Sequence, residues 1–170
     1  KQSGFEIYVD DREYGMEIWN CLLKVGEKLN VRVGCPNLIE RIEGGLLSYG
    51  SDMRRENTPV EAGLERFCNS PFNYIGKDII ERQKMNGPER IIKPITICGG
   101  ADLPHNAEGW KVFSKSKEAG IIASAAWSPD FNSNVAIGMI EREFWDPGTK
   151  LEVKIPEGNR EAIIKEKFWI

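Results

Sequence analysis

Residues 120–143, GIIASAAWSPDFNSNVAIGMIERE, contain two apolar, β-rich runs that are separated by a stretch of Pro, Asp, Asn and Ser. Short runs of this kind between turn-forming residues are typical of β-strands. Similar segments lie on both sides, so that the set is RIIKPITIC (90–98), WKVFSK (110–115), GIIASAAWS (120–128), NVAIGMIERE (134–143), KLEVKI (150–155) and REAIIKEKFW (160–169). Several short strands at such close spacing predict a small antiparallel sheet or barrel.

Helical patterns precede these strands. Residues 10–30 repeat apolar side chains at steps of three and four, which predicts an amphipathic helix. We expect a second short helix within residues 38–50, with Asn37 as its cap, and a third within residues 72–88, where a Gly-Pro pair ends the pattern. The chain is therefore expected to have helices before strands rather than alternating with them.

This order predicts an α+β fold in two parts. An α+β part covers residues 1–77, and a connecting helix plus an antiparallel β-barrel cover residues 78–170. A chain of 170 residues is long enough for one domain or two small ones, and it can bury roughly 70% of its unfolded surface.

The composition excludes several classes of function. A net charge of −3 gives no basic footprint for nucleic acid or an anionic membrane, and no apolar run reaches the roughly 20 residues that span a bilayer. The four cysteines are far apart and lack metal-ligand spacing, so we expect no metal site, and we interpret them as reduced thiols in a cytoplasmic protein.

The opening segment, KQSGFEIYVDD (1–11), predicts a strand with an unusual pair of side chains. Alternation along a strand places Glu6 and Tyr8 on one face and Phe5, Ile7 and Val9 on the other. If the polar face meets water, the pair has no role. If it lines a cavity, a carboxylate beside an aromatic ring suits a flat, nitrogen-rich heterocycle. The residues alone leave both interpretations open.

Five segments together resemble the aminomethyltransferase (glycine cleavage T-protein) superfamily of tetrahydrofolate enzymes. They are SGFEIYV (3–9), CPNLIERIEGGLLSYGSDM (35–53), TPVEAGLERF (58–67), YIGKDIIERQKMNGP (74–88) and SAAWSPDFNSNVAIGMIEREFWDPGTKLEV (124–153). The resemblance covers essentially the whole chain in the family order. It implies the end of a folate-binding core followed by the C-terminal barrel, with the front half of a family member missing.

The resemblance also implies a cofactor and site residues. Tetrahydrofolate presents two adjacent donors on its pterin edge, and a carboxylate can accept both. Glu6 stands where the family places the glutamate that holds the pterin, and Tyr8 stands where a residue borders the pterin and the donor. Trp127 and Ser128 are candidate substrate contacts in a barrel loop, although a turn with a packed Trp is the alternative. The catalytic residues are expected mostly in the missing half.

One segment distinguishes branches of the superfamily. Glycine-cleavage members carry Ala-Arg-Asp-x-Leu-Arg-Leu-Glu where this chain has GCPNLIERIE (34–43), so Asn37 replaces an arginine while Arg41 and Glu43 are kept. The segment is similar to that of the demethylases that act on dimethylsulfoniopropionate. This implies methyl transfer from a small-molecule sulfonium substrate to tetrahydrofolate, which needs no metal.

The sequence leaves two other functions open and gives further expectations about single residues. A glycine-cleavage aminomethyltransferase and a non-catalytic folate-binding module are the other two functions, and a homodimer is possible. We expect the 170-residue chain alone to be inactive. We also expect Arg41 and Glu43 to form a buried ion pair, and Glu61 to tie a loop to backbone donors.

Overall fold

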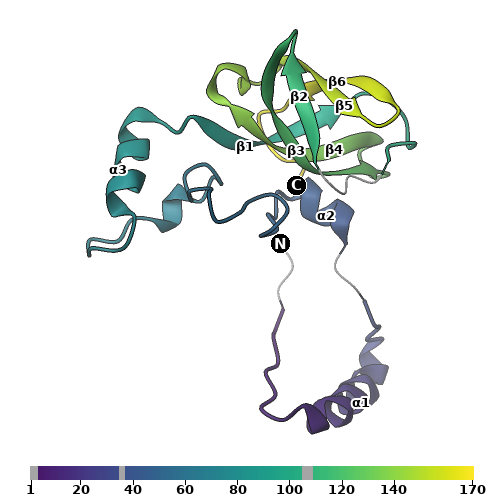
Figure 1. Cartoon of the computed structure of the whole chain (residues 1–170). Helices are drawn as coiled ribbons and strands as arrows, with labels where there is room; N and C mark the ends of the chain where they lie inside the picture. Colours follow the sequence, from purple (N-terminus) through teal and green to yellow (C-terminus); the bar gives the residue numbers. More distant parts are fainter. Residues whose placement is uncertain (1–3, 35–36, 105–108) are drawn as a thin grey trace. The chain divides into compact units, whose positions relative to one another are not determined.

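The computed structural model describes residues 4–34, 37–104 and 109–170, and it divides the chain into two compact units. Unit 1 is Lys1–Pro36 and unit 2 is Asn37–Ile170. The fold is α+β, with few helices and a closed antiparallel barrel towards the end of the chain (Figure 1). No helix in the described ranges is long and apolar enough to cross a bilayer.

Unit 1 contains the predicted amphipathic helix. A 3-10 turn η1 (Arg12–Tyr14), the helix α1 (Gly15–Gly26) and a second 3-10 turn η2 (Glu27–Leu29) follow one another without a break. The Asp11 side chain accepts a hydrogen bond from Glu13 N at 2.9 Å and so caps the start. The helix prediction over residues 10–30 is confirmed.

The predicted opening strand is wrong, because residues 4–9 adopt no regular secondary structure. A strand needs a neighbour that satisfies its N–H and C=O groups. All six strands of the described chain pair with one another in the barrel, and none of them pairs with residues 4–9. The alternating sequence therefore forms an extended segment without a ladder.

Unit 2 is built on a closed barrel with strand order β1-β4-β3-β2-β5-β6, in which all six pairings are antiparallel. The strands are β1 (Arg90–Ile97), β2 (Trp110–Ser114), β3 (Lys117–Ser128), β4 (Ser133–Glu141), β5 (Lys150–Ile155) and β6 (Gly158–Ile164). Each of the six predicted strands is present. The last strand ends at Ile164, earlier than expected, although Lys165 N still donates to Pro94 O of β1.

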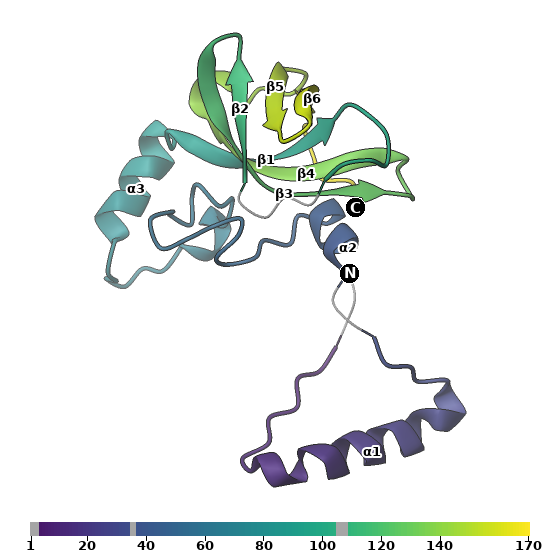
Figure 2. The same ribbon diagram turned by 45° about the vertical axis from the view of Figure 1, so that its right-hand side comes forward.

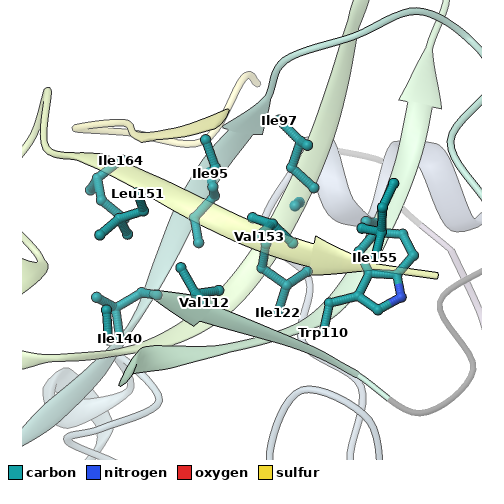
Figure 3. Close-up of a cluster of buried hydrophobic side chains, with 14 residues drawn as sticks. Ile95, Ile97, Trp110, Val112, Ile122, Ile140, Leu151, Val153, Ile155 and Ile164 are labelled. Atoms are coloured by element: carbon teal, nitrogen blue, oxygen red, sulfur yellow. The ribbon is translucent and has the colours of Figure 1, made fainter. Parts of the chain in front are cut away.

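Apolar side chains of alternating positions fill the barrel. In β5 the pattern is strict, with Leu151, Val153 and Ile155 buried and the residues between them exposed. These three meet Ile95, Val112, Ile122 and Ile140 from the other strands, and Trp110 closes one end of the cluster (Figure 3). The barrel interior is thus filled by apolar side chains of the described strands.

One strand is buried on both faces. Seven consecutive residues of β4, from Asn134 to Ile140, are buried. Ala136 and Ile140 belong to the barrel interior, whereas Val135, Ile137 and Met139 form a second cluster on the outside with Ile42 and Ile92. A helix, α2 (Leu38–Glu43), covers this outer face of β3 and β4 (Figure 2).

Asn37 caps α2 as predicted, its side chain accepting from Ile39 N at 2.9 Å, but the helix is shorter than the pattern over residues 38–50 suggests. It ends at Glu43 because Gly45 turns the chain with a φ of +66° and leaves Leu46 exposed. The third predicted helix is confirmed as α3 (Lys77–Asn86), with Gly87 and Pro88 directly after it. Two further 3-10 turns are η3 (Glu65–Phe67) and η4 (Arg142–Phe144).

Candidate functional site

Glu6 and Tyr8 are in contact in unit 1, as the alternation predicts. The Tyr8 hydroxyl donates a short hydrogen bond to Oε2 of Glu6. This bond to the carboxylate, with a smaller contribution from desolvation, raises the pKa of Tyr8 above its ordinary value of 10.0. The pair therefore presents a phenol that stays protonated beside a carboxylate.

Both side chains are exposed in unit 1; the Tyr8 residue retains 85% of its accessible surface. A shallow hollow elsewhere in the unit is lined by Leu23, Lys24, Glu27, Asn30, Val31 and Arg32, and does not include the pair. The assignment of Glu6 and Tyr8 to a folate site stays a prediction. What the structure contributes is their direct contact and an open approach to the carboxylate.

Trp127 and Ser128 lie at the end of β3 and differ in accessibility. Trp127 is partly exposed and pairs with Asn134 across the sheet. Ser128 is fully buried; its hydroxyl donates to Oε1 of Glu43 at 2.5 Å and accepts from Phe131 N at 3.2 Å. A substrate contact for either residue stays a prediction, and the Ser128 hydroxyl already has two protein partners.

The expected ion pair between Arg41 and Glu43 is wrong. Arg41 pairs with Asp52, with Nη1 at 2.5 Å from Oδ2, and Glu43 accepts from Ser128 instead. Positions two apart on a helix point in different directions, so their side chains do not meet. Sequence reasoning missed Asp52 and Ser124, which complete this polar cluster from a loop and from the barrel.

Glu61 has the structural role that its sequence context predicts. It is buried, and Oε2 accepts from Thr58 N at 3.0 Å, which ties the loop to a backbone donor. Oε1 accepts from Nε of Arg90 at 3.2 Å, at the start of β1. This carboxylate joins the loop before α3 to the barrel and has no feature of a ligand site.

The described residues contain no cluster of three or more His, Cys, Asp or Glu side chains that could hold a metal ion. The only histidine of the sequence, His105, and one cysteine, Cys35, lie outside the described residues.

Comparisons with known proteins match both ends of the chain to one family. Residues 1–71 match the GCVT N-terminal domain, and residues 95–169 match the glycine cleavage T-protein C-terminal barrel domain. The fold is similar to that of glycine cleavage system aminomethyltransferase T from Bartonella henselae, with a TM-score of 0.69 and 19% identity over 89% of this chain and 44% of that one. At this identity the likeness shows the fold alone.

Curated relatives differ clearly in their similarity. The dimethylsulfoniopropionate demethylase DmdA of Ruegeria pomeroyi is 52% identical over 169 residues, which are 99% of this chain and 46% of that protein. Aminomethyltransferases of Oceanobacillus iheyensis and Thermoanaerobacter pseudethanolicus are 32% and 29% identical over 98% of this chain, and 44% and 45% of their own lengths. The chain thus spans a little under half the length of these relatives.

Proposed function

Because the chain belongs to the glycine cleavage T-protein family, we propose that it is part of a tetrahydrofolate-dependent methyltransferase that demethylates dimethylsulfoniopropionate. The products would be methylmercaptopropionate and 5-methyltetrahydrofolate. The observation that carries the proposal is the 52% identity to a dimethylsulfoniopropionate demethylase, against 29% and 32% for two aminomethyltransferases. The sequence at residues 34–43, which departs from the glycine-cleavage pattern, supports the same choice.

The described residues fit the proposed cofactor in their chemistry. A carboxylate accepts two parallel hydrogen bonds, and the pterin edge offers two adjacent donors. Within the described ranges, Oε2 of Glu6 accepts from Tyr8, while Oε1 has no hydrogen-bond partner and Glu6 is exposed. We therefore assign Glu6 to hold the pterin and Tyr8 to orient the carboxylate.

The proposed reaction asks little acid or base chemistry of the protein. A methyl group leaves a positively charged sulfur, the electrons of the broken bond stay on that sulfur, and a neutral thioether departs. Tetrahydrofolate would supply the N–H nitrogen that accepts the methyl group, and the proton of that nitrogen would then be released to water. The protein accelerates such a step by alignment and by excluding water. The ring of Tyr8 offers a cation a favourable face.

The assignment of Glu6 to the pterin is tested by the affinity of the full-length protein for tetrahydrofolate, measured by calorimetry. Glu6→Ala removes the acceptor of both pterin donors and should weaken binding by about one to two orders of magnitude. Glu17→Ala removes another exposed carboxylate of unit 1 and serves as the matched control. Unchanged affinity in Glu6→Ala would reject the assignment.

The reaction is tested separately by product formation. Full-length protein supplied with tetrahydrofolate should produce methylfolate when the sulfonium compound is added. The 29–32% identity to aminomethyltransferases favours one second candidate, the aminomethyl transfer of glycine cleavage. Turnover only with a lipoyl carrier protein would support that candidate and overturn the demethylase.

A further inference from the structure

Two serines of β3 connect the barrel to α2. Ser124 and Ser128 lie four residues apart on the strand, so their side chains share a face. It is the outer face, because Ala126 between them packs against the cluster that contains Ile42 of α2. Both serines are buried, although each carries a hydroxyl that needs a partner.

Ser124 belongs to a closed polar cluster. Its hydroxyl donates to Oδ1 of Asp52 at 2.6 Å and accepts from Nη2 of Arg41 at 2.7 Å. Arg41 also bonds to the other Asp52 oxygen and to Leu46 O, and Ser48 N donates to Asp52 at 2.7 Å. One barrel hydroxyl therefore contacts both members of an ion pair that holds α2 and the following loop together.

Ser128 binds α2 two positions further along, at the last residue of the helix. Its hydroxyl donates to the carboxylate of Glu43, the last residue of α2, which is 3% exposed. The carbonyl of Glu43 accepts from Trp169 N at 2.8 Å. The C-terminal turn of α2 is thus held by directional bonds from a strand and from the chain after β6.

These bonds matter because α2 has only six residues. A helix this short is not stable by itself, and apolar packing of Ile42 leaves rotation about that contact weakly restrained. Hydrogen bonds from two points on one strand define both the position and the direction of the helix. We propose that Ser124 and Ser128 are positioning residues, which hold α2 in the orientation that recognition of the sulfonium donor requires.

The inference rests on the proposed function, since Asn37, which stands where glycine-cleavage members have an arginine, caps α2 and shares the orientation of this helix. The test uses full-length protein with Ser124→Ala, Ser128→Ala and the double variant. Each alanine should speed hydrogen exchange of the Arg41 and Gly44 amides, which bond within α2, by about tenfold. The KM for the sulfonium donor should rise by about tenfold, while kcat and folate affinity change less than twofold.

Two controls separate positioning from general stability. Ser114→Ala removes a serine of β2 and should change none of these quantities. Ser124→Thr and Ser128→Thr keep the hydroxyl and should restore most of the lost protection and the KM. Unchanged α2 exchange, an equal loss of protection in β4, or an unchanged KM would each overturn the inference. Folate binding by Glu6→Ala reports on the proposed function independently of these results.

Discussion

The helices α1 and α2 differ in length and in burial, and the longer helix is the less buried one. α1 has 12 residues and a clear apolar stripe, yet among the described residues of unit 1 its one buried position is Gly26, and Leu22 and Val25 keep 47% and 69% of their surface. α2 has six residues and buries Ile42 and Glu43 completely or nearly so. The difference lies in the neighbour: α2 has a sheet with matching apolar and polar groups, and the described part of unit 1 has none.

The largest expected contrast between the two regions comes from removing apolar volume. Ile140→Ala, in the barrel interior, should lower the free energy of unfolding by about 2–5 kcal/mol because it leaves a cavity. Leu22→Ala in α1 should cost about 0.5 kcal/mol or less, as expected for a surface position. Urea unfolding followed by tryptophan fluorescence, to which Trp19 of α1 and Trp110 of the barrel both contribute, measures both. Equal losses would show that α1 is buried against a surface outside unit 1.

A second contrast concerns the turn that ends α2. Gly45→Ala should destabilise unit 2 by about 3 kcal/mol, because φ is +66° and a Cβ would lie 2.6 Å from the ring of Phe168. Gly63 has nearly the same φ, +71°, with open space around it, so Gly63→Ala should cost about 1 kcal/mol. Thermal melting of the two variants compares them. Equal melting temperatures of the two variants would show that Phe168 does not exclude a side chain at position 45.

A third contrast concerns the side chains that cap the two helices. It tests whether the loss of a cap lowers the stability of the barrel as well as that of the helix. Asn37→Ala removes the acceptor for Ile39 N and should lower the stability of the barrel by about 1 kcal/mol. Asp11→Ala removes the equivalent acceptor in unit 1 and should reduce helical circular dichroism without moving the barrel transition. A shift of the barrel melting temperature by Asp11→Ala would contradict the division of the chain into two compact units.

The smallest effect is a titration in unit 1. The bond to Glu6 needs a protonated Tyr8, so it is complete below the ordinary phenol pKa of 10.0 and is lost as pH rises through the raised value. Glu6→Ala should lower the pKa of Tyr8 towards 10.0, and Glu13→Ala should leave it unchanged. The tyrosine ring signals in an NMR titration measure this directly. Identical titration midpoints of Tyr8 in wild type and Glu6→Ala would show that the contact between Glu6 and Tyr8 does not form in solution.

The strands of the barrel could be predicted because each of them is specified by residues that are close together in the sequence. Each strand is a short β-rich run between turn-forming residues, and β4 appears in the sequence as a continuous apolar run because both of its faces are covered. The contact between Glu6 and Tyr8 follows from alternation over three residues. These features need no knowledge of distant parts of the chain.

Two of the failed predictions, the opening strand and the partner of Arg41, depend on contacts with residues that are distant in sequence. Residues 4–9 have the alternation of a strand, but pairing decides whether a strand forms. Arg41 meets Asp52 eleven positions away and Ser124 83 positions away, and no periodicity predicts either pair. A largely buried charge needs a partner, so the sequence correctly predicted that Arg41 is paired, but it named the wrong carboxylate, Glu43 in place of Asp52.

The contact between Trp169 N and Glu43 O brings the start and the end of unit 2 together. A chain whose ends already touch can be cut elsewhere and rejoined with little loss of entropy, because closing a short loop costs little. The exposed β-turn at Lys115 and Ser116 is a natural place for the new ends. Unit 2 is therefore arranged for circular permutation, which would let the order of α2 and the barrel strands in the gene be exchanged while their arrangement in space is kept.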